Sequence, residues 1–440
     1  MAKAISGTFL VAAFVGVAMA ATPGSLDPSF GQRGRVFASL SRDDTASGVA
    51  VQRGGGVLVS GRVRGKISVL RFDRRGRVDR TFGRSGLVRE PVGADPEEGP
   101  VPVALQSDGK IVFAGATADV NGDRQLGDGL LAMYRLLTDG KPDLSFGSRG
   151  AVLVRRRGEL LGTELAIDRV GRIVVATRFH DLNEDVLQVL RFTKRGRLDR
   201  AFGRGGEQKV RFGRQSFLGS VSVDRAGRVY VAGSDFDNRK LNVLRLTSRG
   251  FLDSGFGSAG IASLPRRGIL ALATAVSVQR DGGVLLAGEE RFSGNAPAPC
   301  GYCIFLTVGR LTPGGKPDPT FGTAGVVQTS LELSPAGNPE LALQRDSRIV
   351  VAGAIQHGVS SSFLLARFLR NGTFDPGFGD HGYAVTDMRS AKRDDDYATA
   401  LAIAGDGRLL VAGRSARDEL EGGGSNGRIQ FRFGVARFLP

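Results

Sequence analysis

Two cysteines, Cys300 and Cys303, have the C-x-x-C spacing of a thiol–disulfide exchange site, and the chain contains no others. Such exchange needs a thiolate that a helix N-terminus or a nearby cation stabilises. The Ala-Pro-Ala-Pro run before the pair and the strand-like Ile-Phe-Leu run after it leave no helix to do so. Two thiols are also too few for structural zinc, which takes four ligands. The pair is therefore predicted to be a local disulfide that pins a loop.

Asp119, Asn121 and Asp123 have the D-x-N-x-D spacing that opens an EF-hand calcium loop. The rest of that motif does not follow. Leu130 occupies the twelfth position, which requires a bidentate acid, and Asp128 falls at the tenth. We interpret the segment as a polar loop between two strands, and calcium binding is the alternative.

Other residue types that do chemistry are scarce, with three histidines and no tryptophan among 440 residues. His180 and His357 follow the same strand in two different repeats, and no G-x-S-x-G phrase marks a nucleophile. The lack of tryptophan also leaves few aromatic platforms for sugars or bases. From the sequence we therefore assign no catalytic residue, no metal site and no cofactor.

The elements that would position any site come from a repeated phrase, Asp-x-x-Phe-Gly-x-x-Gly, which occurs seven times. Its copies begin at Asp27, Asp79, Asp143, Asp199, Asp253, Asp318 and Asp375. Chance does not produce seven copies of a four-residue frame. Recurrence at steps of 52 to 65 residues indicates a repeat architecture.

A second pattern lies between the phrases. An apolar run that ends in Ala-Gly or Ser-Gly, such as VLVSG at 57–61, follows a turn signal and precedes a run that ends in Arg-Phe or Arg-Leu. The third copy departs, with IVVAT at 173–177. Asp-Gly turns between apolar runs are typical of tight hairpins. Each repeat therefore predicts four short strands and no helix.

Four antiparallel strands at this period predict an all-β fold, a seven-bladed β-propeller with four antiparallel strands per blade. Closing the ring removes exposed end faces. An open solenoid is the alternative, but it needs distinct polar capping units, whereas the first and last copies resemble the interior ones. The repeats are predicted to span 26–77, 78–141, 142–197, 198–251, 252–316, 317–373 and 374–440 of a single domain, residues 21–440.

The N-terminus has the pattern of a secretory signal peptide. Lys3 precedes an apolar run at 5–19, and Ala18-Met19-Ala20 matches a cleavage site. The run is short for a spanning helix. We expect residues 1–20 to be removed, leaving a secreted, periplasmic or cell-surface protein without a membrane span. An uncleaved anchor is the alternative.

These phrases, LDPSFG with its following glycine and QSDGKIVFAG above all, resemble the delta-60 repeat family. That family is a tandem repeat of bacterial proteins assigned to β-propellers of unknown function. The resemblance covers about residues 26–440. It implies the fold, and it offers no catalytic residues to transfer.

An arginine ends the last strand-like run of each repeat, eight residues before the aspartate of the next phrase. A fixed offset predicts a fixed geometry, in which the two side chains pair by charge-assisted hydrogen bonds. The predicted pairs are Arg71–Asp79, Arg135–Asp143, Arg191–Asp199, Arg245–Asp253, Arg310–Asp318, Arg367–Asp375 and, through ring closure, Arg437–Asp27. We interpret them as structural, with the phrase's Phe packed between blades; seven binding sites are the alternative.

Loop placement follows from the expected path of the chain. If the phrase joins an outer strand to the next inner strand, these crossovers share one face of the ring with the tight hairpins. The variable loops then lie on the other face, with long insertions at 89–100, 116–129, 289–304 and 414–431. Function on a repeat scaffold is expected where loops vary.

The chain has a formal net charge of +16. Arginines cluster in the predicted crossovers and include the possible anion-binding residues Arg74, Arg75, Arg77, Arg195 and Arg197. They would suit an anionic polymer, although a genome biased towards Arg, Ala and Gly produces the same charge. The expected partner is an unknown protein or an anionic envelope polymer, bound by a monomer. Nucleic acid is disfavoured, because export is expected and aromatics are few.

The sequence therefore predicts a secreted or envelope β-propeller that acts as a non-catalytic binding or scaffold module. One alternative is a propeller enzyme, a hydrolase or lyase with its site at the channel mouth. The other is a polyanion-binding envelope protein with an arginine-rich face. Clustered polar side chains of shifted acidity at the mouth would favour the enzyme, and a continuous arginine surface would favour polyanion binding.

Overall fold

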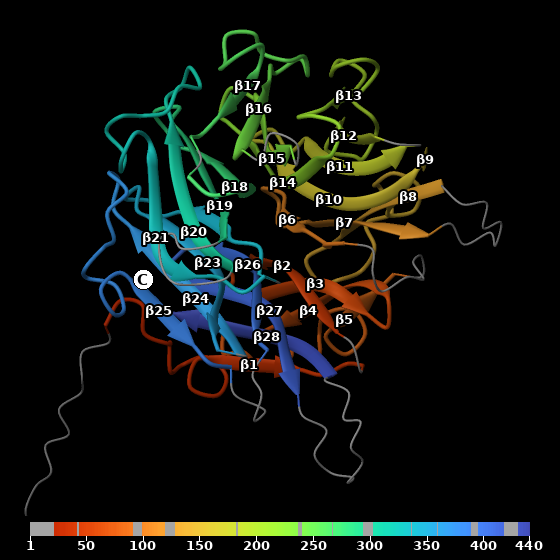
Figure 1. Ribbon diagram of the computed structural model, residues 1–440. Helices are drawn as coiled ribbons and strands as arrows, with labels where there is room; N and C mark the ends of the chain where they lie inside the picture. Colours follow the sequence, from red (N-terminus) through yellow and green to blue (C-terminus); the bar gives the residue numbers. More distant parts are fainter. Residues whose placement is uncertain are drawn as a thin grey trace, which may run out of the picture.

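The computed structural model describes residues 22–41, 44–90, 99–118, 128–181, 184–235, 240–265, 267–293, 302–335, 337–358, 360–388, 395–417 and 430–440. These residues form 28 strands and no helix. The strands make seven four-stranded antiparallel sheets, arranged as blades around a central axis (Figure 1). The predicted seven-bladed β-propeller is confirmed. None of the described residues belongs to a helix that could cross a membrane.

Each blade runs from an innermost strand at the axis to an outermost strand at the rim. Blade 1 contains β2 (Thr45–Val51), β3 (Val57–Val63), β4 (Lys66–Phe72) and β5 (Leu87–Arg89). Blade 2 contains β6 (Val103–Leu105), β7 (Ile111–Ala118), β8 (Asp128–Leu136) and β9 (Ala151–Arg157). Blade 3 contains β10 (Glu159–Ile167), β11 (Ile173–Asp181), β12 (Glu184–Phe192) and β13 (Glu207–Val210). Blade 4 contains β14 (Ser216–Val223), β15 (Val229–Asp235), β16 (Asn242–Leu246) and β17 (Ile261–Ser263). Blade 5 contains β18 (Leu270–Val278), β19 (Val284–Ser293), β20 (Tyr302–Leu311) and β21 (Val326–Glu332). Blade 6 is β22 (Glu340–Leu343), β23 (Ile349–His357), β24 (Ser360–Phe368) and β25 (Tyr383–Thr386).

Blade 7 closes the ring by combining both ends of the chain. It contains β26 (Tyr397–Ile403), β27 (Leu409–Arg417) and β28 (Gln430–Phe438), and its outermost strand is β1 (Arg35–Ala38). Antiparallel pairing sets Val36 opposite Val435. The first strand of the chain thus completes the last blade, and the seventh sheet has its fourth strand only when the two ends of the chain meet.

The strand phase differs from the expected one. Each blade takes three strands from one sequence repeat and its outermost strand from the next. The crossover was expected to join an outer strand to the next inner strand, and this is wrong: in blade 1, residues 73–86 join β4 to β5 of the same sheet. The phrase specifies a connection between two neighbouring strands, and its sequence does not reveal which two.

Hairpins and crossovers nevertheless share one face of the ring, because both occupy the same end of antiparallel strands. In blade 1 the β2–β3 hairpin at 52–56 and the crossover lie at one end, and the β3–β4 turn lies at the other. We call the end with the hairpins and crossovers the crossover face, and the end with the β3–β4 type of turn the loop face. The predicted signal peptide and much of the predicted insertions lie outside the described residues.

The hydrophobic core is divided into seven main clusters, each between two adjacent blades. Successive strand residues point to opposite faces of a sheet, so one strand supplies two clusters. Val57 and Val59 of β3 pack towards blade 7, whereas Leu58 packs towards blade 2. Every residue of β3 is buried, which explains why these runs lack polar alternation.

Candidate functional site

The predicted arginine–aspartate pairs lie together in every blade. The nitrogen–oxygen distances are 2.7 to 2.9 Å in the pairs Arg71–Asp79, Arg135–Asp143, Arg191–Asp199, Arg245–Asp253, Arg310–Asp318, Arg367–Asp375 and Arg437–Asp27. The last pair joins the two ends of the chain, with Nε of Arg437 2.9 Å from Oδ2 of Asp27.

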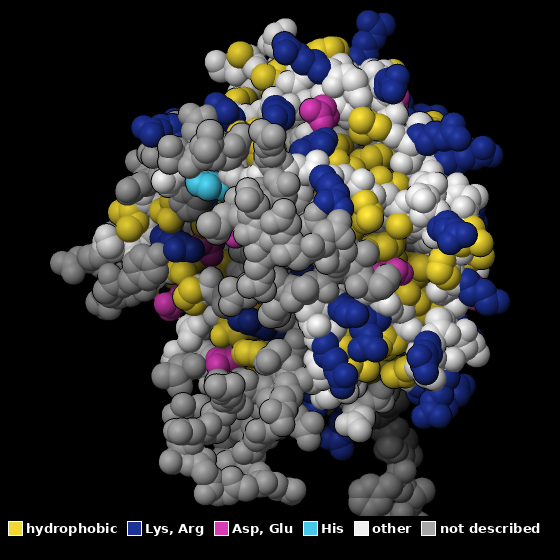
Figure 2. All heavy atoms as spheres, turned by 90° about the vertical axis from the view of Figure 1, so that its right-hand side faces the viewer, with side chains coloured by type: hydrophobic (Ala, Val, Ile, Leu, Met, Phe, Trp, Pro, Cys, Tyr) yellow, Lys and Arg dark blue, Asp and Glu magenta, His cyan; other side chains and the backbone are white. Residues whose placement is uncertain are grey.

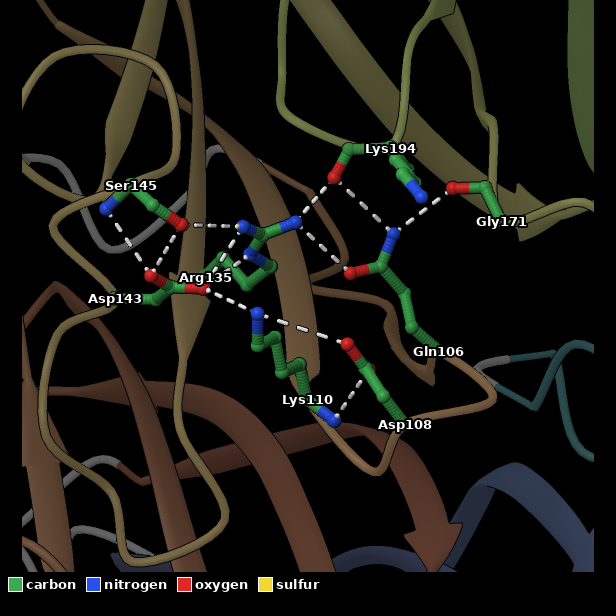
Figure 3. Close-up of polar contacts among 8 residues, drawn as sticks. All are labelled: Gln106, Asp108, Lys110, Arg135, Asp143, Ser145, Gly171 and Lys194. Atoms are coloured by element: carbon green, nitrogen blue, oxygen red, sulfur yellow. Dashed lines mark hydrogen bonds and ion pairs between the residues drawn. The ribbon is translucent and has the colours of Figure 1, made fainter.

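Each pair is part of a contact between blades, which we call the latch. In blade 2, Arg135 binds Asp143 through Nε and donates from Nη1 to the Lys194 carbonyl of blade 3 (Figure 3). In all seven blades the guanidinium also lies over the buried Phe of its own crossover, 4.3 to 5.0 Å from the ring centroid. The latch is a packing device, since its groups are committed to one another and to the next blade.

A glycine of the neighbouring crossover covers each of these rings. In blade 2, Gly140 has a φ of +88°, and a Cβ built on it would lie 2.8 Å from the Phe82 ring of blade 1. No other residue fits this close approach in a left-handed conformation. The glycines of the repeated phrase region therefore fix the contact between blades.

A second cation reinforces the latch where the repeat supplies one. The residue before the second strand is Lys110 in blade 2, Arg348 in blade 6 and Arg408 in blade 7, and it lies 2.7 to 3.1 Å from the latch aspartate. These aspartate side chains are 3 to 7% exposed. In blades 3 and 4 the equivalent cations, Arg172 and Arg228, lie closest to a hairpin aspartate, at 2.6 Å, and Arg172 also reaches the latch aspartate Asp199 at 4.0 Å.

Blades 1 and 5 have glycine at this position, Gly56 and Gly283, and both contain a cavity there. The cavities measure about 770 Å³ and about 520 Å³. Asp79 and Asp318 are 24% and 18% exposed, against 3 to 7% for the aspartates with a second cation 2.7 to 3.1 Å away. The larger cavity is therefore a gap in a structural latch, and its central charged pair is already bonded.

The remaining residues singled out in the sequence do not converge on one site. Cys303 is buried in β20 and disulfide-bonded. Cys300, Asp119, Asn121 and Asp123 lie outside the described residues. The possible anion-binding residues are all exposed in the crossovers of blades 1 and 3, namely Arg74, Arg75, Arg77, Arg195 and Arg197.

A different cavity, of about 420 Å³, occupies the axial channel. Every blade contributes to its wall, through Thr45, Pro100, Glu164, Leu218, Thr274, Glu340 and Thr399 among others. These residues lie on the innermost strands or just before them, which gather at the centre of the ring (Figure 1). Each innermost strand begins at the loop face and ends at the hairpin on the crossover face. Most of these residues lie in the first half of their strand, so the cavity lies at the loop-face end of the channel.

Hydroxyl groups tie the channel wall together across the blade boundaries. Thr399 of blade 7 donates to the Ala46 carbonyl of blade 1 at 2.7 Å, and Thr274 of blade 5 donates to the Pro339 carbonyl at 2.6 Å. Ser47 of blade 1 accepts from the Val101 amide at 2.8 Å. These bonds hold the innermost strands in a fixed arrangement around the cavity.

Two glutamates from different blades line this cavity, and they occupy the same repeat position. Glu164 pairs with Ala176 and Glu340 with Ala352, the alanine of the apolar run in each copy. The other five copies have Gly48, Pro102, Ser220, Ala275 and Ala400 there. Blades 3 and 6 are three apart in a ring of seven, so the two carboxyls project from nearly opposite sides of the channel.

The two carboxyls perturb each other. Burial raises the pKa of Glu340 to about 8. Burial, together with the negative charge of Glu340, raises the pKa of Glu164 well above its usual range. Among the described residues, no side chain donates a hydrogen bond to either carboxyl. The pair therefore retains a proton near neutral pH, because two like charges in a desolvated site cannot both form readily.

Two arginines line the same cavity, one from blade 3 and one from blade 7. Arg178 lies on β11, and Arg414 lies on β27, between the Tyr397 and Phe431 rings at 4.4 and 4.6 Å from their centroids. Within the described part of the chain, no carboxylate pairs with either guanidinium. Stacking between rings fixes the plane of Arg414 and leaves its edge free to bind an anion.

Sequence reasoning missed these four residues. The available signal was a glutamate in two copies where the other copies have a small residue or proline. A charged residue at a position that a repeat otherwise keeps small marks a departure from the scaffold. The IVVAT departure of the third copy, immediately before Arg178, is a second such signal.

The comparisons with known proteins agree with this architecture. A family model described as "Domain of unknown function (DUF5122) beta-propeller" matches residues 106–146, 227–256 and 344–378. The chain thus carries repeats of the β-propeller kind. No curated protein matches it.

Three similar solved structures are enzymes by their titles. Polysaccharide lyase Uly1 is 11% identical, with a TM-score of 0.48 and coverage of 90% of both chains. An inactive variant of virginiamycin B lyase from Staphylococcus aureus is 10% identical, with a TM-score of 0.43 and coverage of 91% of this chain and 98% of that one. The α-L-arabinofuranosidase from Fusarium graminearum is 8% identical, with a TM-score of 0.44 and coverage of 95% and 97%.

These neighbours are titled as enzymes and not as scaffold modules, so the prediction of a non-catalytic binding or scaffold module is withdrawn. Identities of 8 to 11% and these TM-scores carry over no substrate and no catalytic residue. Any assignment of chemistry must come from the channel itself.

Proposed function

We propose that the protein is an enzyme that cleaves an anionic substrate by acid–base catalysis at the loop-face end of its axial channel, as a hydrolase or a lyase. One observation carries the proposal: Glu164 and Glu340 line the same small cavity from opposed blades, and the pKa of each is raised. Both reaction types need one group that donates a proton and one that accepts it.

The carboxyl pair can supply both groups. Two interacting carboxyls lose their protons in separate steps, so the pair passes through a state that holds a single proton. In that state the protonated carboxyl donates to the leaving-group oxygen. The ionised carboxyl accepts a proton from water in a hydrolase, or from the carbon beside the substrate's acid group in a lyase. The two carboxyls have then exchanged roles, and proton exchange with solvent restores them.

The two arginines suit an anionic group on the substrate. A guanidinium presents a planar fork that matches carboxylate or sulfate oxygens. Arg178 and Arg414 line the cavity without a carboxylate partner among the described residues. A substrate anion between them would fix the scissile bond relative to Glu164 and Glu340.

Two further assignments belong to this proposal. The repeats are delta-60 repeats, an assignment supported by the LDPSFG and QSDGKIVFAG phrases. The enzyme works outside the cytoplasm, as the signal-like segment at 1–20 suggests. In that location acidic polysaccharides are natural substrates to test first.

The test is cleavage of a panel of polyuronates and sulfated polysaccharides by wild type and variants. Glu164→Gln and Glu340→Gln should each lower kcat by about 10²- to 10⁴-fold, the usual contribution of a general acid or base. Glu332→Gln is the control, since Glu332 is exposed on β21. Arg178→Gln should raise KM by about tenfold, because a charged hydrogen bond to the substrate is lost.

The product and the pH profile identify the reaction. A lyase leaves a double bond that absorbs ultraviolet light, whereas a hydrolase incorporates oxygen from isotopically labelled water. Activity should rise as pH approaches about 8, where Glu340 ionises and leaves the pair with a single proton, held on Glu164. Cleavage that survives both glutamine substitutions at the wild-type rate would contradict the proposal.

A further inference from the structure

Charge is distributed unevenly over the crossover face. The crossovers of blades 1 to 3, residues 73–86, 137–150 and 193–206, contain twelve exposed Lys or Arg residues, and Asp139 is their one acid with a side chain nearly half exposed, at 46%. We call these twelve residues the arginine arc: Arg74, Arg75, Arg77, Arg80, Arg84, Lys141, Arg149, Lys194, Arg195, Arg197, Arg200 and Arg204. The equivalent crossovers of blades 4 to 6 contain three, Arg249, Lys316 and Arg370, together with the exposed Asp380.

This asymmetry argues against composition as the source of the charge. An arginine-rich genome would load equivalent repeat positions alike, and it does not here. The crossover turn of blade 1 carries Arg74, Arg75 and Arg77, whereas the three equivalent positions in blade 5 carry Pro313, Gly314 and Lys316. Figure 2, which views the side of blades 1 to 3, shows many more Lys and Arg than Asp and Glu side chains.

The arc is continuous from blade to blade. The Gly83 amide of blade 1 donates to the Asp139 carbonyl of blade 2 at 2.9 Å, and the Gly147 amide of blade 2 donates to the Arg195 carbonyl of blade 3 at 3.0 Å. Consecutive crossovers are therefore in contact, and their exposed cations follow one another along the rim.

The cations of the arc are largely unneutralised. Lys141 lies 3.3 Å from Asp139, but Arg74, Arg75, Arg77, Arg195 and Arg197 have no carboxylate partner among the described residues. Besides Asp139, an exposed acid on the same face is Asp108, in the hairpin of blade 2. The arginine guanidinium is weakly hydrated and presents paired N–H donors that match the oxygens of a carboxylate or sulfate. A row of such groups therefore loses little hydration when it binds an anion.

We propose that the arginine arc binds a linear acidic polysaccharide, whose carboxylate or sulfate groups contact the crossovers of blades 1 to 3 in succession. A polymer matches the arc because its charges recur along one path, as the cations do. The crossovers of the arc expose no aromatic side chain on which a base could stack, which disfavours single-stranded nucleic acid. The arc lies on the face opposite the channel site, so it is a second site and tethers the protein while the loop face stays open.

Matched triple variants test the proposal. Arg74→Ser/Arg75→Ser/Arg77→Ser removes three charges from the arc. Arg370→Ser/Arg249→Ser/Lys316→Ser removes three charges from the same repeat positions in blades 6, 4 and 5. Only the backbone carbonyls of Arg74 and Arg75 contribute to the latch, so both variants should fold, which thermal unfolding checks.

Binding is measured by anisotropy of fluorescent heparin and polygalacturonate at a series of salt concentrations. The arc variant should bind about tenfold or more weakly, and its slope of log K against log salt should fall by about 2 to 3, because each lost contact retains counterions. The control variant should stay within about twofold of wild type. Equal losses in both variants would overturn the proposal, since net charge alone would then drive binding.

Two other probes complete the test. Double-stranded DNA of equal charge and vesicles of anionic lipid should bind more weakly than either polysaccharide. Preference for DNA or for vesicles would overturn the polysaccharide assignment, as would failure of both polysaccharides to bind at low salt. None of these measurements depends on catalysis, so they stand apart from the proposed function.

Discussion

At the residue scale, one repeat position decides how fully each latch carboxylate is neutralised. Lys110, Arg348 and Arg408 place a second cation beside the aspartate, and Gly56 and Gly283 leave that place empty. The same logic applies at the channel, where two copies place a glutamate at a position that five copies keep free of charge. Function in this molecule therefore depends on where single repeats depart from the shared pattern.

Gly283→Arg should stabilise the protein by about 1 kcal/mol, because it supplies the missing cation and restricts the unfolded chain. Gly283 does not have a left-handed φ, and a Cβ there would meet Oε1 of Gln279 at 2.8 Å and Oδ1 of Asp281 at 3.2 Å, both of them ends of side chains. The Gln279 oxygen is a buried acceptor without a donor among the described residues, so the new guanidinium can bond to it and to Asp318.

Chemical denaturation measures the effect, and the neighbouring glycine provides the control. Gly282 has a φ of +87°, so Gly282→Arg should destabilise by about 1 kcal/mol or more. A destabilised Gly283→Arg would show that the cavity of blade 5 is not a missing cation site.

At the scale of the element, the outermost strand β1 (Arg35–Ala38) and its crossover differ from those of the other blades, because they also close the ring. They join the two ends of the chain, and Asp27 accepts bonds from both Arg437 and Arg408. Burial would raise the pKa of Asp27, but hydrogen bonds from Ser29 and the charge of Arg437 lower it. Its contribution to stability is therefore present above its usual pKa and is lost on acidification below it.

Asp27→Ala should cost about 3 to 5 kcal/mol in the free energy of unfolding, because it leaves the buried Arg437 guanidinium without its anion. Asp79→Ala is the comparison: that aspartate is 24% exposed and bonded by one arginine, so about 1 kcal/mol is expected. Urea titration at neutral pH measures both. Equal losses would mean that closure of the ring does not depend on the Asp27 latch.

Much of this element scale could be predicted from the sequence. The seven phrases, the turn signals and the fixed offset from Arg to Asp specify blade number and latch, because they are local patterns repeated along the chain. The strand phase could not be predicted, since Asp79 to Gly86 reads the same whichever two strands it joins. Glu164 and Glu340 were missed because their proximity arises only when the ring closes.

At the scale of the whole molecule, the ring separates two surfaces with different electrostatics. The loop face contains the channel cavity with its carboxyl pair, and the crossover face carries the arginine arc. Hydrogen-bonded hydroxyls and latches hold all seven blades in one ring, which gives the channel residues fixed positions. The fold alone does not specify a reaction. The central claim is that the channel holds a carboxyl pair that stays protonated near neutral pH.

That claim has a consequence for stability. The pKa of Glu340 is raised from 4.5 to about 8 in the folded protein, so the folded state binds more protons than the unfolded state between these values. Stability should therefore decrease as pH rises from about 4.5 to about 8, and Glu340→Gln should remove this part of the dependence. The variant would thus be more stable than wild type at pH 8 although less active.

Carbon-13 NMR titration of the glutamate carboxyls tests the claim without a substrate. Two resonances should titrate far above the ordinary glutamate range, one of them with a midpoint of about 8 that is absent in Glu340→Gln. In that variant the pKa of Glu164 should fall, because the charge that repels its ionised form is gone. A spectrum in which every glutamate titrates near 4.5 would contradict the account.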